Sequence, residues 1–331
     1  METLRRPISS ISGSVTLQSP VQKAYGLRRH GKPTVFWLDD LGLVERNVVY
    51  GHAIHVTEPE IELMGRRKVS ITSHPSCSFH MRNGITPVVP LRASGVNVSM
   101  GLDDKTINDD EDAVMELRMM HKLHRLHTFD LATPALSAYE ALEIATLNGG
   151  KATGFADEFG ALVAGMKGDA ILVDLDRVAR DPWIDPEFDI ADAFVERAMG
   201  TDVATVVIGG KLVVENHQPP HNRRRGSLPR SARVLCQGSH PQQRAHADFF
   251  RKIKPYAQAW YATWHETMLD ALRCCAVVRS IDGLWNGTQP SRAASGWLTP
   301  RRRHIGRKVV VTLWLGHQAL CAAICRSLAY G

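Results

Sequence analysis

The chain has 331 residues, 44% of them hydrophobic, which is enough for a real core in one large or two ordinary domains. It contains no run of about 18 apolar residues, and its N-terminus lacks the apolar core of a signal peptide. The composition therefore argues against a transmembrane helix, and we expect a cytoplasmic protein with no membrane partner. The six cysteines form no CxxC pair, which favours reduced thiols over a disulfide framework.

The net charge of +6 is divided unevenly along the chain. Residues 1–215 hold 22 Lys and Arg and 30 Asp and Glu, a net charge of −8, whereas residues 216–331 hold 18 and 4, a net charge of +14. We therefore expect an acidic, regularly patterned part followed by a basic tail of different character.

Strand and helix signals alternate in the first half of the chain. Residues 1–20 are Ser-rich and lack periodicity, so we expect an irregular terminus there. Apolar spacing then predicts helices over 21–30, 34–41, 57–64, 87–94 and from the acidic cap at 108–111 to about 127. Short apolar runs predict strands over 47–52, 68–73 and 96–101, with a polar loop from 74 to 84. This alternation is typical of a parallel sheet with buried strands.

The next segment has a different pattern. A helix is expected over 137–148 and strands over 169–174, 203–208 and 211–215, the last two joined through Gly209-Gly210 as a hairpin. These strands do not alternate with helices, which indicates a small β subdomain. After residue 218 the pattern decays, apart from a helical, aromatic-rich stretch at 241–270 and a lone strand at 309–315.

Three of the predicted strands end in residues that can perform hydrolytic chemistry. His52 follows the first, His74 the second, and Asp103 the third. Polar groups at the carboxyl ends of successive buried strands are where a (β/α)8 barrel places its active site. A carboxylate there can bind a cation and take a proton from water, and a histidine can orient water or polarise a substrate. Taken singly, each residue also fits a structural histidine, a helix cap or a polar turn.

Two other clusters have weaker functional readings. His121, His124 and His127 recur every three residues on the long helix, a spacing that drifts around the helix, so we expect solvated side chains or interactions with its C-terminal dipole. Arginine runs at 223–225 and 301–303 suggest nucleic-acid binding as an alternative, although they do not lie within a recognised nucleic-acid-binding fold.

Taken together, the motifs are more specific than any one of them. The chain resembles the amidohydrolase superfamily over about residues 21–215, most closely the branch that holds chlorotriazine hydrolases, cytosine and guanine deaminases and adenosylhomocysteine deaminases. The segments that carry the resemblance are Gly51-His52-Ala53-Ile54-His55, Ser73-His74-Pro75-Ser76, Asn83-Gly84-Ile85-Thr86-Pro87-Val88, the run 95–104 that ends in Gly101-Leu102-Asp103-Asp104, and residues 141–150 and 160–174.

The resemblance implies an α/β fold and a set of site residues. Residues 21–165 would form about strands 5/6 to 8 of a partial (β/α)8 TIM-type barrel. Residues 166–218 would form part of a flanking small β subdomain, and residues 219–331 a basic tail that is irregular outside 241–270. His52 would hold substrate or the hydrolytic water, and Asp103 would bind a divalent zinc or iron ion and shuttle the proton. His74 and Asn83 would bind a small heterocyclic substrate.

The chain also departs from the family pattern. The family's first-strand His-x-His pair and its strand-five histidine have no counterpart before His52. We therefore expect an N-terminally truncated copy that retains its ion weakly and hydrolyses C–N or C–Cl bonds of nitrogen heterocycles with impaired activity. The alternative is a non-catalytic fragment or binding module that requires a partner, either a second copy or a complementing barrel half. Nucleic-acid binding through the tail is the third reading.

Overall fold

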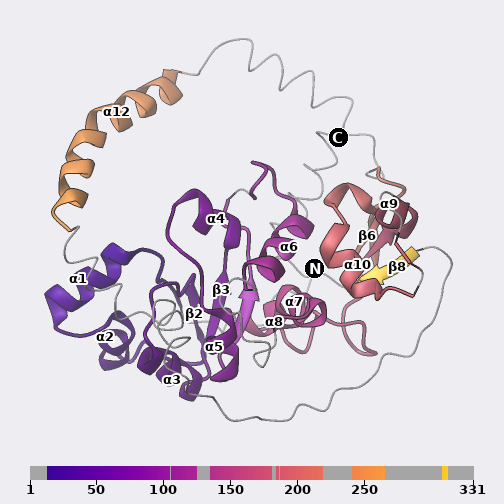
Figure 1. Cartoon of the computed structure of the whole chain (residues 1–331), viewed down its shortest axis with the longest axis horizontal. Coiled ribbons are helices and arrows are strands. Elements are labelled where there is room, and N and C mark those ends of the chain that lie inside the picture. Colours follow the sequence, from indigo (N-terminus) through magenta and orange to yellow (C-terminus); the bar gives the residue numbers. More distant parts are fainter. Residues whose placement is uncertain are drawn as a thin grey trace, which may run out of the picture.

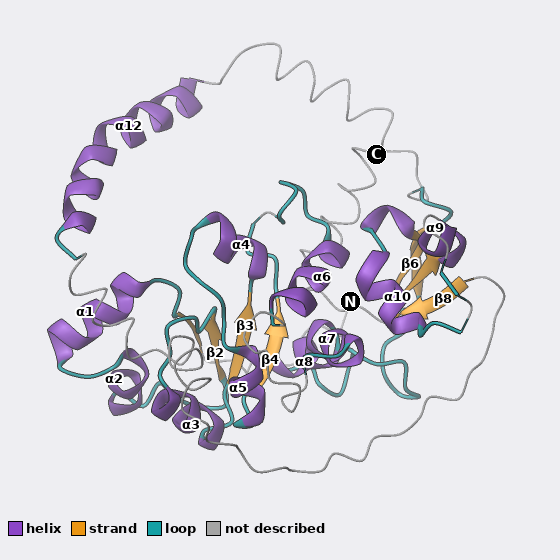
Figure 2. Ribbon diagram, in the orientation of Figure 1, coloured by secondary structure: helices purple, strands orange, loops and turns teal. Residues whose placement is uncertain are grey.

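The structure is a computed structural model, and it describes residues 13–104, 106–124, 135–180, 184–185, 187–218, 241–264 and 308–311. Figures 1 and 2 show two sheets with helices packed around them. The arginine runs at 223–225 and 301–303 lie outside these residues. Among the helices that the structure describes, none is long and apolar enough to cross a bilayer.

The first sheet is parallel, as the alternation predicts. Its strands are β1 (Gly13–Thr16), β2 (Val48–Gly51), β3 (Ser70–Ser73) and β4 (Asn97–Met100), adjacent in chain order. The register aligns Thr16, Gly51, Thr72 and Ser99, so the carboxyl ends of all four strands meet at one edge. The α/β class and the parallel sheet are confirmed, and both are consistent with part of a TIM-type barrel.

We expected residues 1–20 to be irregular, and this expectation was wrong for residues 13–16. Gly13–Thr16 forms strand β1, which pairs with β2 along its whole length. The segment lacks the bulky, β-branched run that marks a buried strand, because among the described residues it has a neighbouring strand on one side only and its Ser14 and Thr16 side chains are exposed. Its strand conformation is therefore imposed by pairing rather than by its own composition.

One face of this sheet forms the centre of the core. Tyr50, Ile71 and Val98 stand side by side in register, and each is fully buried. They belong to the same apolar cluster as side chains of α2 (Thr34–Asp40), α3 (Glu58–Arg66), α5 (Val88–Ala93) and α6 (Ala113–Leu123). Two further helices lie in the same part of the chain, α1 (Pro20–His30), which contributes to a second small cluster, and α4 (Pro75–His80).

Two helices differ from the sequence expectation. The polar stretch after β3 was expected to be a loop, but it contains α4, which begins at Pro75, a residue suited to a first helical turn. The helix expected over 137–148 is divided at Thr146, whose φ of −122° and ψ of −86° interrupt the helix between α7 (Ala138–Ala145) and α8 (Leu147–Ala152).

The expectation that the α6 histidines are solvated was wrong, whereas His121 in the last turn and His124 at the C-cap lie where the expected interaction with the helix C-terminal dipole requires them. His121 and His124 are buried, and His121 Nδ1 lies 3.5 Å from Glu196 Oε1. The reason is tertiary packing, because α6 contacts α7 and α10 (Ile190–Arg197) along the side that carries these rings. His127 lies outside the described residues.

The second sheet is antiparallel and lies in the segment where the small β subdomain is predicted. Its order is β7 (Lys211–Val214), β6 (Val203–Ile208), β5 (Ala170–Asp174) and β8 (Lys308–Val311). Gly209 and Gly210 have φ values of 55° and 73°, the left-handed pair that a two-residue hairpin requires. Three helical elements lie between β5 and β6, and none of them was predicted from the sequence. They are α9 (Leu175–Arg180), α10 and a short 3-10 helix (Gly200–Asp202).

The basic tail contributes two described elements. β8 was expected to be a lone strand, but it pairs with β5. The aromatic-rich stretch forms α12 (Pro241–Ala262), which confirms the predicted helix up to that point. Residues 265–270 of the predicted helix lie outside the described part.

Candidate metal centre

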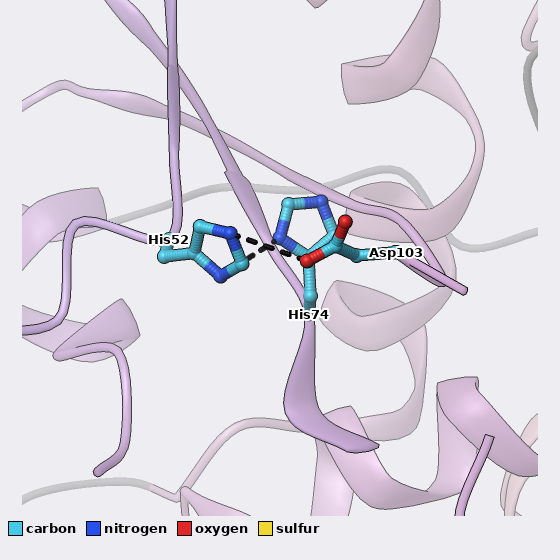
Figure 3. A group of neighbouring side chains, drawn as sticks. All are labelled: His52, His74 and Asp103. Atoms are coloured by element: carbon cyan, nitrogen blue, oxygen red, sulfur yellow. Dashed lines mark hydrogen bonds and ion pairs between the residues drawn. The ribbon is translucent and has the colours of Figure 1, made fainter. Parts of the chain in front are cut away.

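Three candidate residues from three consecutive strands meet at the carboxyl edge of the first sheet. His52 follows β2, His74 follows β3, and Asp103 lies three residues after the end of β4 (Figure 3). The His52 ring faces both of the other side chains, with its Nδ1 3.2 Å from His74 Nδ1 and its Nε2 3.3 Å from Asp103 Oδ2. One donor atom from each residue can be chosen so that all lie within 4.8 Å of one another.

The backbone at two of these positions is in a conformation that few residues adopt. His52 and Ala53 have φ values of 69° and 47°, and Asp103 and Asp104 have values of 48° and 89°. Each such residue costs on the order of 1–3 kcal/mol and persists where the surroundings hold it. His52 is held on both sides, because its N–H donates to Thr72 O at 2.7 Å and its carbonyl accepts from Thr86 Oγ1 at 2.6 Å.

The electrostatics of the two imidazoles favour a cation. Burial lowers the pKa of His52, with Asp103 opposing the shift. Burial and the neighbouring His52 lower the pKa of His74 to about 4, and Asp103 again opposes. Both rings are therefore neutral near pH 7, and each offers one unprotonated nitrogen, while the Asp103 side chain is 45% exposed. Two neutral imidazoles and a carboxylate are donors that zinc accepts.

Gly101 determines where the His74 ring can lie. A Cβ atom at this position would approach His74 Cδ2 and Nε2 to 2.8 Å, closer than side chains normally come. The missing side chain therefore lets the ring lie against the end of β4.

We expect Gly101→Ala to displace the His74 ring and to weaken metal binding by about tenfold or more, the range seen when a ligand loses its orientation. Gly168→Ala is the matched control, because its new methyl would meet Gly210 at an ordinary 3.6 Å. Zinc titration of both variants measures the effect, and equal affinities would contradict this role for Gly101.

Cys77 was not among the predicted site residues, although it belongs to the loop after His74 that the sequence offered as a candidate substrate contact, and it touches the site. Its Sγ donates to Asp103 Oδ2 at 3.0 Å, and Gln18 Nε2 lies 3.6 Å from the same sulfur. Burial and the Asp103 carboxylate raise the pKa of Cys77 to about 12, so the thiol stays protonated and remains a donor. The sequence feature that could have identified Cys77 is its position three residues after His74, in the first turn of α4.

Glu116 was also missed, and it fixes the segment that follows His74. This fully buried carboxylate on α6 accepts hydrogen bonds from the Ser76 backbone N–H at 3.0 Å and from the Ser76 hydroxyl. Burial raises the pKa of Glu116 to about 7, and the two Ser76 hydrogen bonds oppose the shift. The contact joins residues 40 positions apart, so no local sequence pattern predicts it.

The raised pKa of Glu116 predicts a pH-dependent stability. The folded protein keeps the proton between the ordinary pKa of 4.5 and about 7, a range in which the unfolded chain has lost it, so this group's contribution falls as pH rises through that window. Glu116→Gln carries no charge, and we expect its stability relative to wild type to rise by about 2 kcal/mol between pH 5 and pH 8. Urea unfolding at both pH values checks this, and a difference independent of pH would contradict it.

Asn83, the other predicted substrate-binding residue, is buried on the loop between α4 and α5. Its N–H donates to Ser78 O at 3.0 Å, and its backbone accepts a hydrogen bond from the ring of His55. Its role toward substrate stays a prediction.

Comparisons with known proteins identify a family and several relatives. Residues 12–213 match the amidohydrolase family. A 5-methylthioadenosine/S-adenosylhomocysteine deaminase from Syntrophomonas wolfei is 34% identical over 193 residues, 58% of this chain and 43% of that protein. A 5'-deoxyadenosine deaminase from Methanosarcina barkeri is 33% identical over 190 residues, 57% of this chain and 42% of that protein. The chain thus spans less than half the length of these relatives.

Solved structures show the same fold. An adenosine deaminase from Xanthomonas campestris with bound zinc superposes with a TM-score of 0.61 at 27% identity, over 68% of this chain and 50% of that one. A zinc complex of an atrazine chlorohydrolase from Arthrobacter aurescens gives 0.59 at 24% identity, over 66% and 48%, and at that identity the likeness shows the fold alone. Because the family match covers more than half of the chain and includes the three strand-end residues, the protein belongs to the amidohydrolase family.

Proposed function

We propose that this chain carries part of the active site of a metal-dependent hydrolase that acts on a C–N or C–Cl bond at a ring carbon of a nitrogen heterocycle. The observation that carries the proposal is the meeting of His52, His74 and Asp103 at the carboxyl edge of the sheet. The names of its relatives, deaminases of adenosine-type nucleosides, support this class of substrate.

His52, His74 and Asp103 would hold the divalent ion, zinc or iron. The ion would supply Lewis acidity, which makes water nucleophilic near neutral pH. Asp103 is suited to move the proton, since its carboxylate is half-exposed while the imidazoles are buried. In deamination the water oxygen bonds to the ring carbon, the C–N bond breaks, and Asp103 passes the proton to the departing ammonia. Asn83 would contact the ring of the substrate.

The test is a substrate panel with the purified chain. Adenosine-type nucleosides, aminopyrimidines and chlorotriazines are incubated with zinc or iron(II), and ammonia or chloride release is measured. Metal-stimulated release from at least one class is expected. No release from a chain shown to contain bound metal would contradict the hydrolase assignment.

A second candidate is a module that needs a partner to complete its barrel. Among the described residues, β1 and β4 are the two edges of a four-stranded sheet, each with an unpaired side. Open edges attract further strands, and a (β/α)8 barrel has none. A second copy or a complementing barrel half would close it. Light scattering after size-exclusion chromatography tests this, and a compact monomer that is active alone would contradict it.

A further inference from the structure

The helix α12 carries a large apolar surface that the site does not use. Its 22 residues run apart from the two sheets in Figure 1, and every side chain described from Arg244 to Thr263 is exposed. At its end, Trp264 packs against Val21 and Ala24 of α1, with the Arg28 guanidinium 5.1 Å from its ring centroid. The helix is therefore anchored at one end and open along its length.

The apolar side chains of α12 occupy one face. Phe249, Ile253, Tyr256 and Trp260 are spaced by four, three and four residues, which aligns them along a helix, and Phe250 and Tyr261 widen the stripe on one side. These side chains are far from buried, since Phe250 is 66% and Tyr256 77% exposed. Exposed apolar patches of this kind mark interaction sites.

The basic side chains of α12 favour an anionic partner. Successive residues of a helix are rotated by about 100°, which places Lys252 and Lys254 on the two borders of the aromatic stripe and Arg251 on the opposite face of the helix. The acidic residue Asp248 is already paired with Arg251. An aromatic face bordered by lysines, on a helix of low mean hydropathy, is typical of helices that lie in the interface of an anionic membrane. The net charge of +14 over residues 216–331 adds to the attraction.

We propose that α12 binds this protein to the surface of anionic lipid bilayers, with Phe249, Tyr256 and Trp260 entering the headgroup region and Lys252 and Lys254 contacting lipid phosphates. The sequence-based expectation of no membrane partner rested on the absence of a spanning segment, and an interfacial helix needs none. The proposal is independent of the hydrolase assignment, because α12 contributes no residue to the metal centre.

The experiment is co-sedimentation of the full chain with unilamellar vesicles. We expect at least tenfold tighter binding to vesicles containing phosphatidylglycerol than to pure phosphatidylcholine, and a loss of this preference at high salt. A triple variant, Phe249→Ser/Tyr256→Ser/Trp260→Ser, should bind the vesicles at least tenfold more weakly. A double variant, Lys252→Gln/Lys254→Gln, should show a smaller preference for the anionic lipid. Phe188→Ser is the control, since Phe188 is an exposed aromatic outside α12.

Three results would overturn the proposal. The first is equal sedimentation with both lipids, and the second is unchanged binding by the triple α12 variant while circular dichroism shows the fold intact. The third is a dimer in the absence of vesicles that the triple variant dissociates, combined with no vesicle binding. That last result would assign the apolar face to a second copy of the chain.

Discussion

Asp103→Asn should weaken zinc binding by more than about 100-fold and abolish metal-dependent hydrolysis. The substitution removes the only charged donor of the group formed by His52, His74 and Asp103, and with it the base that we propose accepts the proton from water. Outer partners of metal ligands typically contribute 10–100-fold in affinity, so the loss of a ligand should exceed that. Zinc affinity is measured by titration against a competing chelator, and turnover by ammonia release.

Asp104→Asn is the matched control for this prediction. Asp104 is the adjacent carboxylate, is exposed and lies outside the three-residue group. Both positions have positive φ, and Asn tolerates that conformation, so neither variant should strain the backbone further. Equal metal affinity in the two variants would show that Asp103 is not a ligand.

Glu60→Ala should destabilise the fold by about 3–5 kcal/mol, the range for breaking a buried ion pair from one side. Glu60 has no exposed surface, and its carboxylate accepts from the Lys23 ammonium, from Val35 N–H at 3.0 Å and from Thr57 N–H and Oγ1 at 2.8 Å each. Removing it leaves the Lys23 ammonium, itself only 3% exposed, buried without the carboxylate. Urea unfolding measures the loss.

Glu62→Ala on the same helix is the control, because Glu62 is exposed and pairs only with Arg66 one turn later, so we expect a change below about 1 kcal/mol. Lys23→Met/Glu60→Leu removes both charges together and should recover part of the loss. Equal destabilisation by Glu60→Ala and Glu62→Ala would contradict the role assigned to the buried pair.

Local patterns predicted the features that depend on local sequence. Strands β2, β3 and β4 were found because each is buried on both faces and therefore reads as a short apolar run. The capping box of α3, formed by Thr57 and Glu60, follows from residues three positions apart. Such signals also located His52, His74 and Asp103, because each residue directly follows a strand or lies within three residues of its end.

The features that the sequence did not predict depend on contacts between distant segments. Strand β1 exists because β2 lies beside it, and His121 is buried because α7 and α10 cover α6. The contacts of Glu116 with Ser76 and of Lys23 with Glu60 join residues 40 and 37 positions apart. Such pairs leave no mark in local periodicity, so they emerge only when the helices have been placed on the sheet.

The most direct test of the metal centre is a crystal structure of the protein grown with zinc, with anomalous diffraction recorded at the zinc edge. We predict one strong anomalous peak at the carboxyl edge of the first sheet, within coordination distance of His52, His74 and Asp103. A peak elsewhere, or full zinc loading with no density between these three side chains, would contradict the proposed site.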